Sequence, residues 1–152
     1  MRKWLITLAL MAVLAIAVVP ALAQTTHTKT VTEDDINDSF RVNNPVRIRV
    51  SDLSVDLQAG QVVVTATINR RNADPNIVVT TYVPSLTNGR IYWSVAAKLV
   101  NGEPVSQELL DQINASISSS WRNYIKRNLP TGRVTAFEIT EDAVTISYTT
   151  PR

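Results

Sequence analysis

The chain has 152 residues, with 15 lysines and arginines, 13 aspartates and glutamates, one histidine and no cysteine. The lack of cysteine excludes disulfides, thiolate nucleophiles and thiolate metal sites. The one histidine, His27, lies in a polar segment near the N-terminus, so neither a Ser-His-Asp triad nor a histidine metal centre is expected.

Residues 1–23 have the three parts of a secretory signal peptide. Arg2 and Lys3 give a positive start. The apolar run Leu5–Val19 is about 15 residues long, short of the ~20 that a membrane-spanning helix needs. Residues 21–23 (Ala-Leu-Ala) match a signal peptidase site, which predicts cleavage before Gln24. We therefore expect an exported protein that is soluble after cleavage, periplasmic or extracellular, and not a lipoprotein, because no cysteine follows the run.

The mature chain is predicted to be neutral. Arg2 and Lys3 leave with the signal, so 13 side chains of each sign remain. General affinity for nucleic acid needs excess positive charge, and no nucleic-acid partner is expected. Residues 24–30 suggest a flexible leader, and residues 31–152 have the length of a single domain.

A short helix is expected over about residues 32–42. Thr32 is a suitable N-cap, and Asp35 stands at the reciprocal capping-box position. Strand-like alternation follows over residues 46–57, and its phase changes by one residue near Ser51-Asp52. Such a change predicts a bulge. A further strand is expected over residues 62–68.

Residues 77–83 and 91–99 flank a strong hairpin signal at Asn88-Gly89. A two-residue loop would set Val83 against Ser94. A three-residue loop, with Gly89 at the left-handed bulge position, would set Val83 against Trp93. The second register places nearly all large apolar residues on one face, and for that reason we expect it.

A long amphipathic helix is predicted from Ser106 to about Asn128. Its apolar residues form one stripe at helical spacing, namely Leu109, Leu110, Ile113, Ile117, Trp121, Tyr124 and Ile125. Two strands should follow, over about residues 133–140 and 143–149. The predicted fold class is α+β: a highly curved antiparallel sheet wrapped around one long amphipathic helix, with a short N-terminal helix.

The aromatic residues of the helix and sheet suggest two alternatives. Trp93, Trp121 and Tyr124 could belong to an ordinary filled core, which pattern alone favours. Alternatively, helix and sheet could enclose an apolar slot for an acyl chain, with room left by Ser116 and residues 118–120. The candidate slot residues are Val64, Ala66, Ile68, Val79, Val83, Trp93, Val95, Ala97, Ile113, Ile117, Trp121 and Tyr124.

Charged and polar motifs give little sign of catalysis. Arg122, Lys126 and Arg127 are candidates for contact with a lipid headgroup or a membrane, although a solvated face with favourable dipole placement explains them more simply. The acid pairs at 34–35 and 141–142 are typical of a helix start and a turn. No enzyme activity, cofactor or metal is predicted. The glycosylation triplets at Asn37 and Asn114 fall in predicted helices and carry little weight.

Four short motifs occur at residues 32–37 (TEDDIN), 88–91 (NGRI), 100–105 (VNGEPV) and 139–146 (ITEDAVTI). Together they resemble a known family, the bacterial TULIP-like lipid-binding proteins of the LmeA-like phospholipid-binding branch. The first resembles its "T-E-x-x-[IL]-N" opening, and the second its hairpin. Residues 100–105 (VNGEPV) resemble its helix entry, and residues 139–146 (ITEDAVTI) its closing strand, with Ala143 where glycine is usual.

The resemblance implies a curved sheet around a long helix, an apolar tunnel that shields lipid tails, and binding or transfer without catalysis. Two functions stay open. The first is a carrier of a lipid or another amphiphile at the cell envelope. The second is an envelope structural or interaction domain with a filled core, which docks to another protein through a sheet edge.

Overall fold

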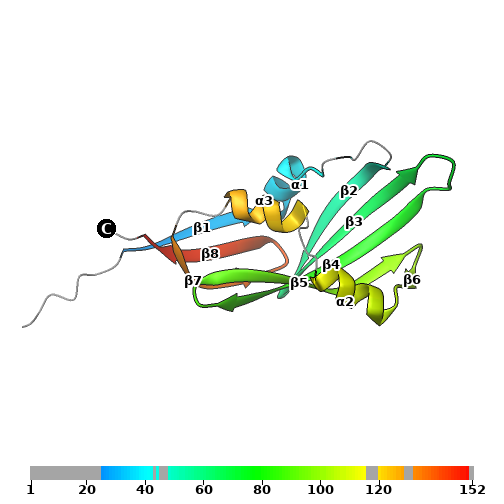
Figure 1. The fold of residues 1–152 in the computed structure, drawn as a ribbon. Helices are drawn as coiled ribbons and strands as arrows, with labels where there is room; N and C mark the ends of the chain where they lie inside the picture. The colour runs from blue at the N-terminus through cyan, green and yellow to red at the C-terminus, as the bar shows by residue number, and fades with distance from the viewer. Residues whose placement is uncertain (1–24, 43, 45–47, 116–119, 129–131, 151–152) are drawn as a thin grey trace, which may run out of the picture.

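The structure is a computed structural model that describes residues 25–42, 44, 48–115, 120–128 and 132–150. The predicted signal peptide lies outside these residues. Figure 1 shows the elements in chain order: β1 (Thr26–Thr32), α1 (Glu33–Ser39), β2 (Ile48–Gln58), β3 (Gln61–Arg70), β4 (Asn76–Thr87), β5 (Arg90–Val100), β6 (Glu103–Pro104), α2 (Gln107–Ala115), α3 (Ser120–Asn128), β7 (Arg133–Ile139) and β8 (Ala143–Thr149).

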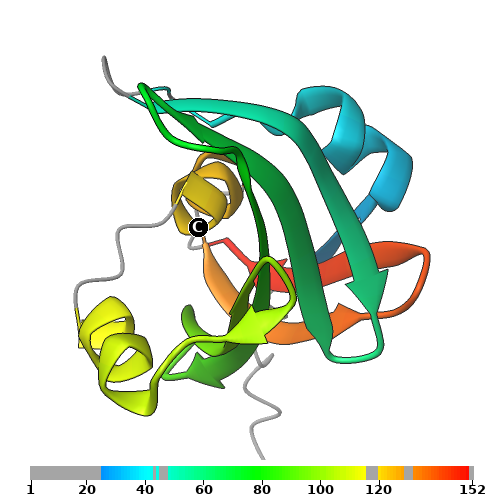
Figure 2. The same ribbon diagram turned by 90° about the vertical axis from the view of Figure 1, so that its right-hand side faces the viewer.

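The described strands form two antiparallel sheets. One has three strands in the order β1-β8-β7, and the other has five in the order β2-β3-β4-β5-β6. Figure 2 shows the strong curvature of the five-stranded sheet, with strands of the smaller sheet crossing near one end of it. Among the described residues, no helix is long and apolar enough to cross a membrane.

The prediction of one long helix is wrong. The structure has two nine-residue helices, α2 and α3, which lie apart from one another in both views (Figures 1 and 2). Each helix packs on its own cluster: Leu110 of α2 joins Val95, whereas Tyr124 and Ile125 of α3 join the main core. The apolar stripe therefore combined two separate packing faces. The fold is mostly β, and no sheet wraps around a long helix.

The N-terminal region is more regular than the sequence suggested. Residues 24–30 were expected to be a flexible leader, but Thr26–Thr32 form β1 and pair with β8 from Thr26↔Thr149 to Thr32↔Ala143. The predicted capping box of α1 is confirmed, because the Asp35 backbone N–H donates to the Thr32 hydroxyl and the Thr32 N–H donates to the Asp35 carboxylate.

The predicted bulge in β2 is confirmed, with the register shift between Ser51 and Ser54. The preferred β4–β5 register is wrong. Asn88 and Gly89 both have positive φ, 53° and 75°, as a two-residue type I′ turn requires. Val83 consequently pairs with Ser94. Farther from the turn, Tyr82 pairs with Val95 but Thr81 pairs with Ala97. Ala96 is therefore an extra residue, a bulge that shifts the register by one.

The two sheets are joined by the tips of two hairpins, each of which bonds to β7. At the β2–β3 turn, the Gly60 N–H donates to the Ile139 carbonyl over 3.0 Å. At the β4–β5 turn, the Gly89 carbonyl accepts from the Val134 N–H over 3.1 Å. These bonds hold β7 near both of its ends.

Two asparagines cover outer edges of the five-stranded sheet. Asn37 of α1 accepts from the Val55 N–H over 2.7 Å and donates to the Val55 carbonyl over 2.8 Å. Asn114 of α2 does the same at Val95 of β5, over 2.7 and 3.0 Å. The Glu33 carboxylate also accepts from the Leu57 N–H over 2.7 Å.

The main core lies between α1, α3 and the two sheets. Its buried residues are Ile36, Phe40, Val55, Leu57, Val62, Val64, Trp93, Tyr124, Ile125, Val134, Ile139, Val144 and Ile146. The smaller cluster under α2 has Val95 and Leu110 as its buried members.

Candidate functional site

A cavity of about 380 Å³ lies between the β4–β5 hairpin, α3 and the start of β7. Its lining residues come from three elements and the turns beside them: Gly89, Arg90, Ile91, Tyr92, Trp93, Asn123, Ile125, Lys126, Gly132 and Val134. Arg90, Tyr92 and Lys126 are exposed, so the cavity opens to solvent at their side chains. Trp93, Ile125 and Val134 are buried and form its apolar wall.

The apolar wall is held by contacts across the two sheets. The Trp93 ring meets the Phe137 ring of β7 edge to face, with centroids 5.7 Å apart and planes at 90°. Since Trp93 lies on β5 of the larger sheet, this contact fixes the hairpin wall against the smaller sheet. The bond from Val134 to Gly89 closes the same wall at the turn.

Tyr124, the residue before Ile125 on α3, fixes the helical wall of the cavity. The Tyr124 ring packs edge to face on Phe40, with centroids 5.2 Å apart. Its hydroxyl is hydrogen-bonded to the Ser39 hydroxyl over 2.5 Å. α3 is thereby attached to the end of α1, and Ile125 and Lys126 are presented to the cavity.

The cavity mouth is cationic. Arg90 and Lys126 are the charged residues of the lining, which contains no aspartate or glutamate. Arg133 adjoins them, because its side chain packs over Gly89, where a Cβ atom would lie only 2.9 Å from the Arg133 Nε. Arg127 follows Lys126 on α3 and donates from Nε to the Asn123 carbonyl over 3.3 Å.

The residues of the predicted apolar slot differ in burial, and the long helix that was to cover them is not observed. Val64, Ala66, Trp93, Val95 and Tyr124 are buried, as core residues are. Four others are half-buried: Ile68, Val79, Val83 and Ile113. Of the predicted slot residues that the structure describes, Trp93 lines the cavity and the others do not. Ile117 lies outside the described residues, and so do the side chains of Trp121 and Arg122.

Ala97 is exposed, against expectation. The two-residue turn and the irregularity at Ala96 set Ala97 opposite Thr81 and separate it from the face of Trp93 and Val95. Of the residues predicted for headgroup contact, Lys126 lines the cavity and Arg127 follows it on α3.

Most of the cavity residues were missed from the sequence. Ile125 was recognised as part of the apolar stripe, and Ile91 alternates with Trp93 along β5, so both carried a local signal. The position of Val134 and Gly132 beside the hairpin depends on a contact between residues about 45 positions apart, for which a single sequence has no local signal.

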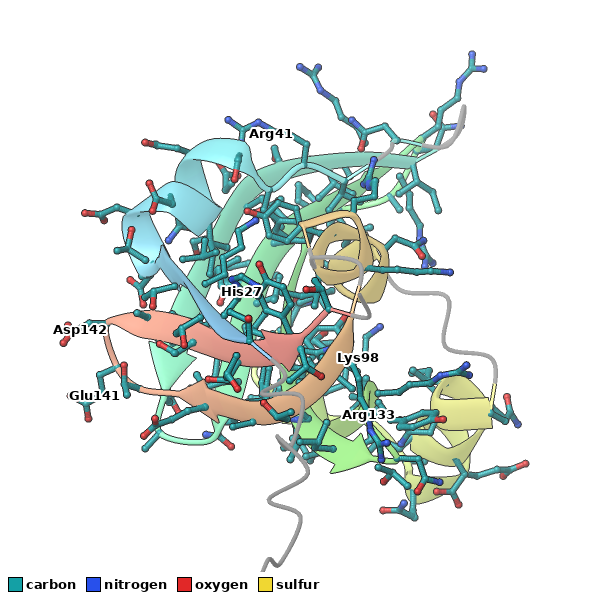
Figure 3. All side chains as sticks on the ribbon, turned by 90° about the vertical axis from the view of Figure 1, so that its left-hand side faces the viewer. His27, Arg41, Lys98, Arg133, Glu141 and Asp142 are labelled. Carbon is teal, nitrogen blue, oxygen red and sulfur yellow. The ribbon has the colours of Figure 1, made fainter. Side chains whose placement is uncertain are left out.

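Lys98 lies half-buried on β5, directly opposite the buried Thr80 of β4. Desolvation by burial lowers the pKa of its ammonium group. Among the described residues, no carboxylate pairs with it. Lys98 is labelled in Figure 3, and its pairing with Thr80 places it well along β5 from the β4–β5 turn, where Arg133 packs over Gly89.

Comparisons with known proteins give no relative: no family model, no curated protein and no solved structure matches this chain. The resemblance to TULIP-like proteins therefore stays a prediction, and the architecture that it implied is not the one observed. The described residues also contain no group of three or more histidine, aspartate or glutamate side chains placed to hold a metal ion.

Proposed function

We propose that the protein is a non-catalytic binder of a small amphiphile, held in the cavity between the β4–β5 hairpin, α3 and β7. The observation that carries the proposal is the cavity itself. Its volume of about 380 Å³ falls in the range of ~300–1,000 Å³ that is typical of small-molecule sites. Buried apolar side chains form its wall, and polar groups stand at its mouth, which is the usual composition of such sites.

The lining chemistry favours a ligand with an apolar part and one anionic group. The apolar part would contact Trp93, Ile125 and Val134. The anionic group would lie between Arg90 and Lys126, since an anion at that position meets cations and no lining carboxylate. The lining offers no acid-base pair, so we infer binding and not catalysis.

The expected affinity is modest. Eight buried methylene groups contribute about 6 kcal/mol at ~0.8 kcal/mol each. The entropy lost when ligand and protein associate reduces this binding free energy. Attraction between the anionic group and the two cations, Arg90 and Lys126, offsets part of the reduction. Dissociation constants in the micromolar to millimolar range follow. The predicted signal peptide would place this binding at the cell envelope.

Calorimetric titration with decanoate tests the proposal. Ile91→Trp should weaken binding at least tenfold, because the larger ring occupies the cavity. Val83→Trp is the matched control: both positions are half-buried on the same hairpin, but Val83 does not line the cavity. Equal affinity of the two variants, or no binding by the parent protein, would overturn the proposal in favour of an interaction domain with a filled core.

A further inference from the structure

We propose that the end of the molecule that carries the β4–β5 hairpin docks on the surface of an anionic lipid bilayer. This docking surface, named here the hairpin end, consists of Leu86, Arg90, Tyr92, Lys126, Arg127 and Arg133. The proposal does not depend on a ligand in the cavity, because it rests on the exposed groups around the cavity mouth.

The first observation is the convergence of four cations from three elements. Arg90 and Lys126 line one cavity mouth although they are 36 positions apart in the sequence. Arg133 packs over Gly89, the residue next to Arg90. Arg127 lies one residue after Lys126. All four are exposed, and each cation near an anionic bilayer surface strengthens binding by a similar increment.

The second observation is the presence of two exposed large apolar side chains on the hairpin that carries Arg90. Tyr92 is 51% exposed and lines the cavity with Arg90, whereas Leu86 is 41% exposed and pairs with Ile91, on the opposite face of the hairpin. Water-exposed aromatic and aliphatic groups beside lysine and arginine are the composition of protein surfaces that lie in the membrane interface. Tyrosine suits this position because its ring is apolar and its hydroxyl remains hydrated.

The third observation is the separation of charge. Glu33, Asp34 and Asp35 begin α1, and the Glu33 N–H bonds to the Asp142 carbonyl, which brings the β7–β8 turn beside that acidic start. Figure 3 shows Glu141 and Asp142 on one side of the molecule and Arg133 on the other. A negatively charged surface would attract the hairpin end and repel the acidic side, so one orientation is favoured.

These observations favour a bilayer over an acidic protein as the partner. A bilayer provides anionic headgroups at many positions and an apolar layer beneath them, which matches scattered cations at the same end of the molecule as Tyr92 and Leu86. Nucleic acid fits less well, because a phosphate backbone offers no apolar layer for Leu86.

Co-sedimentation with vesicles tests the proposal. The parent protein should bind phosphatidylglycerol vesicles and not phosphatidylcholine vesicles, with binding weakened by salt. The double variant Arg90→Gln/Lys126→Gln should bind about 25-fold more weakly. Arg70→Gln/Arg71→Gln is the matched control, since it removes two exposed cations where β3 ends and the β3–β4 connection begins, at the opposite end of β4. This control should bind about tenfold more tightly than the hairpin-end variant.

A second pair of variants tests the apolar part. Tyr92→Ser should weaken binding several-fold, whereas Ile77→Ser should not. Ile77 is 54% exposed but lies at the start of β4, far along the strand from the hairpin turn. The proposal is overturned by absence of binding to anionic vesicles. Equal losses of vesicle affinity in the two double variants would overturn it as well. So would an affinity of Arg90→Gln/Lys126→Gln equal to that of the parent protein.

Discussion

Asn37 and Asn114 perform the same task on opposite sides of one sheet. Each uses its amide oxygen and nitrogen to bind both backbone groups of one strand residue, Val55 or Val95. At that one residue, the asparagine side chain makes the two hydrogen bonds that a neighbouring strand would otherwise make. Both asparagines also belong to glycosylation triplets, and a glycan on either would replace one of the two N–H groups of the nitrogen that donates to the strand.

These amide pairs should contribute measurably to stability. Asn37→Ala and Asn114→Ala should each lower the free energy of unfolding by about 1–3 kcal/mol, because each leaves a strand N–H and carbonyl without a partner. Asn123→Ala is the control: Asn123 is an exposed helical asparagine whose side chain has no hydrogen bond within the described residues. Urea denaturation provides the measurement. A loss in the control equal to that at Asn37 would contradict the explanation.

Gly89 should tolerate alanine less well than Gly60 does. Both glycines have positive φ, 75° and 77°, so alanine costs about 1 kcal/mol of backbone strain at either position. A Cβ at Gly60 meets nothing within 4 Å, whereas at Gly89 it collides with Arg133. Gly89→Ala should therefore destabilise the protein more. The excess should shrink in an Arg133→Ala background, and a thermal melt of the four variants measures it.

Lys98 should make stability depend on pH in the alkaline range. Burial lowers the pKa of its ammonium in the folded state below the ordinary value of 10.5, so the unfolded chain holds more protons between the two values. Stability should therefore rise with pH from the folded pKa up to about 10.5, and the contribution is unfavourable below this window.

Variants at Lys98 separate this effect from other titrations. Lys98→Met removes the charge and should be more stable than the parent protein at pH 7, without the alkaline rise. Lys98→Arg keeps its charge throughout and should lack the rise while remaining less stable than Lys98→Met. Urea midpoints from pH 7 to 11 provide the measurement, and an unchanged slope in both variants would refute the assignment.

Local signals in the sequence predicted local structure well. The capping box at Thr32 and Asp35 and the bulge after Ser51 depend on neighbouring residues, and both were found where expected. The prediction of one long helix was wrong because α2 and α3 continue one apolar stripe in the sequence but pack on separate clusters, Leu110 with Val95 and Tyr124 with the main core.

The candidate site was harder to predict than the fold. Trp93 was assigned to a slot beneath a single helix and Lys126 to headgroup contact at the end of that helix, whereas both line the cavity. The cavity instead depends on the contact of the β4–β5 turn with Val134, and on the turn type that Asn88 and Gly89 adopt. The hairpin register was chosen by apolar pattern, whereas the turn geometry decided it.

The pairing of β1 with β8 has a consequence for how the chain folds. Thr26 pairs with Thr149, so the first strand of the fold obtains its partner from its last strand. The β2–β3 and β4–β5 hairpins can form from neighbouring residues, but β1 stays without its strand partner until residues 143–149 are present. Contacts of such large sequence separation slow folding. Completion of the smaller sheet is therefore expected to be a late step, which leaves β1 unpaired until β8 has been synthesised.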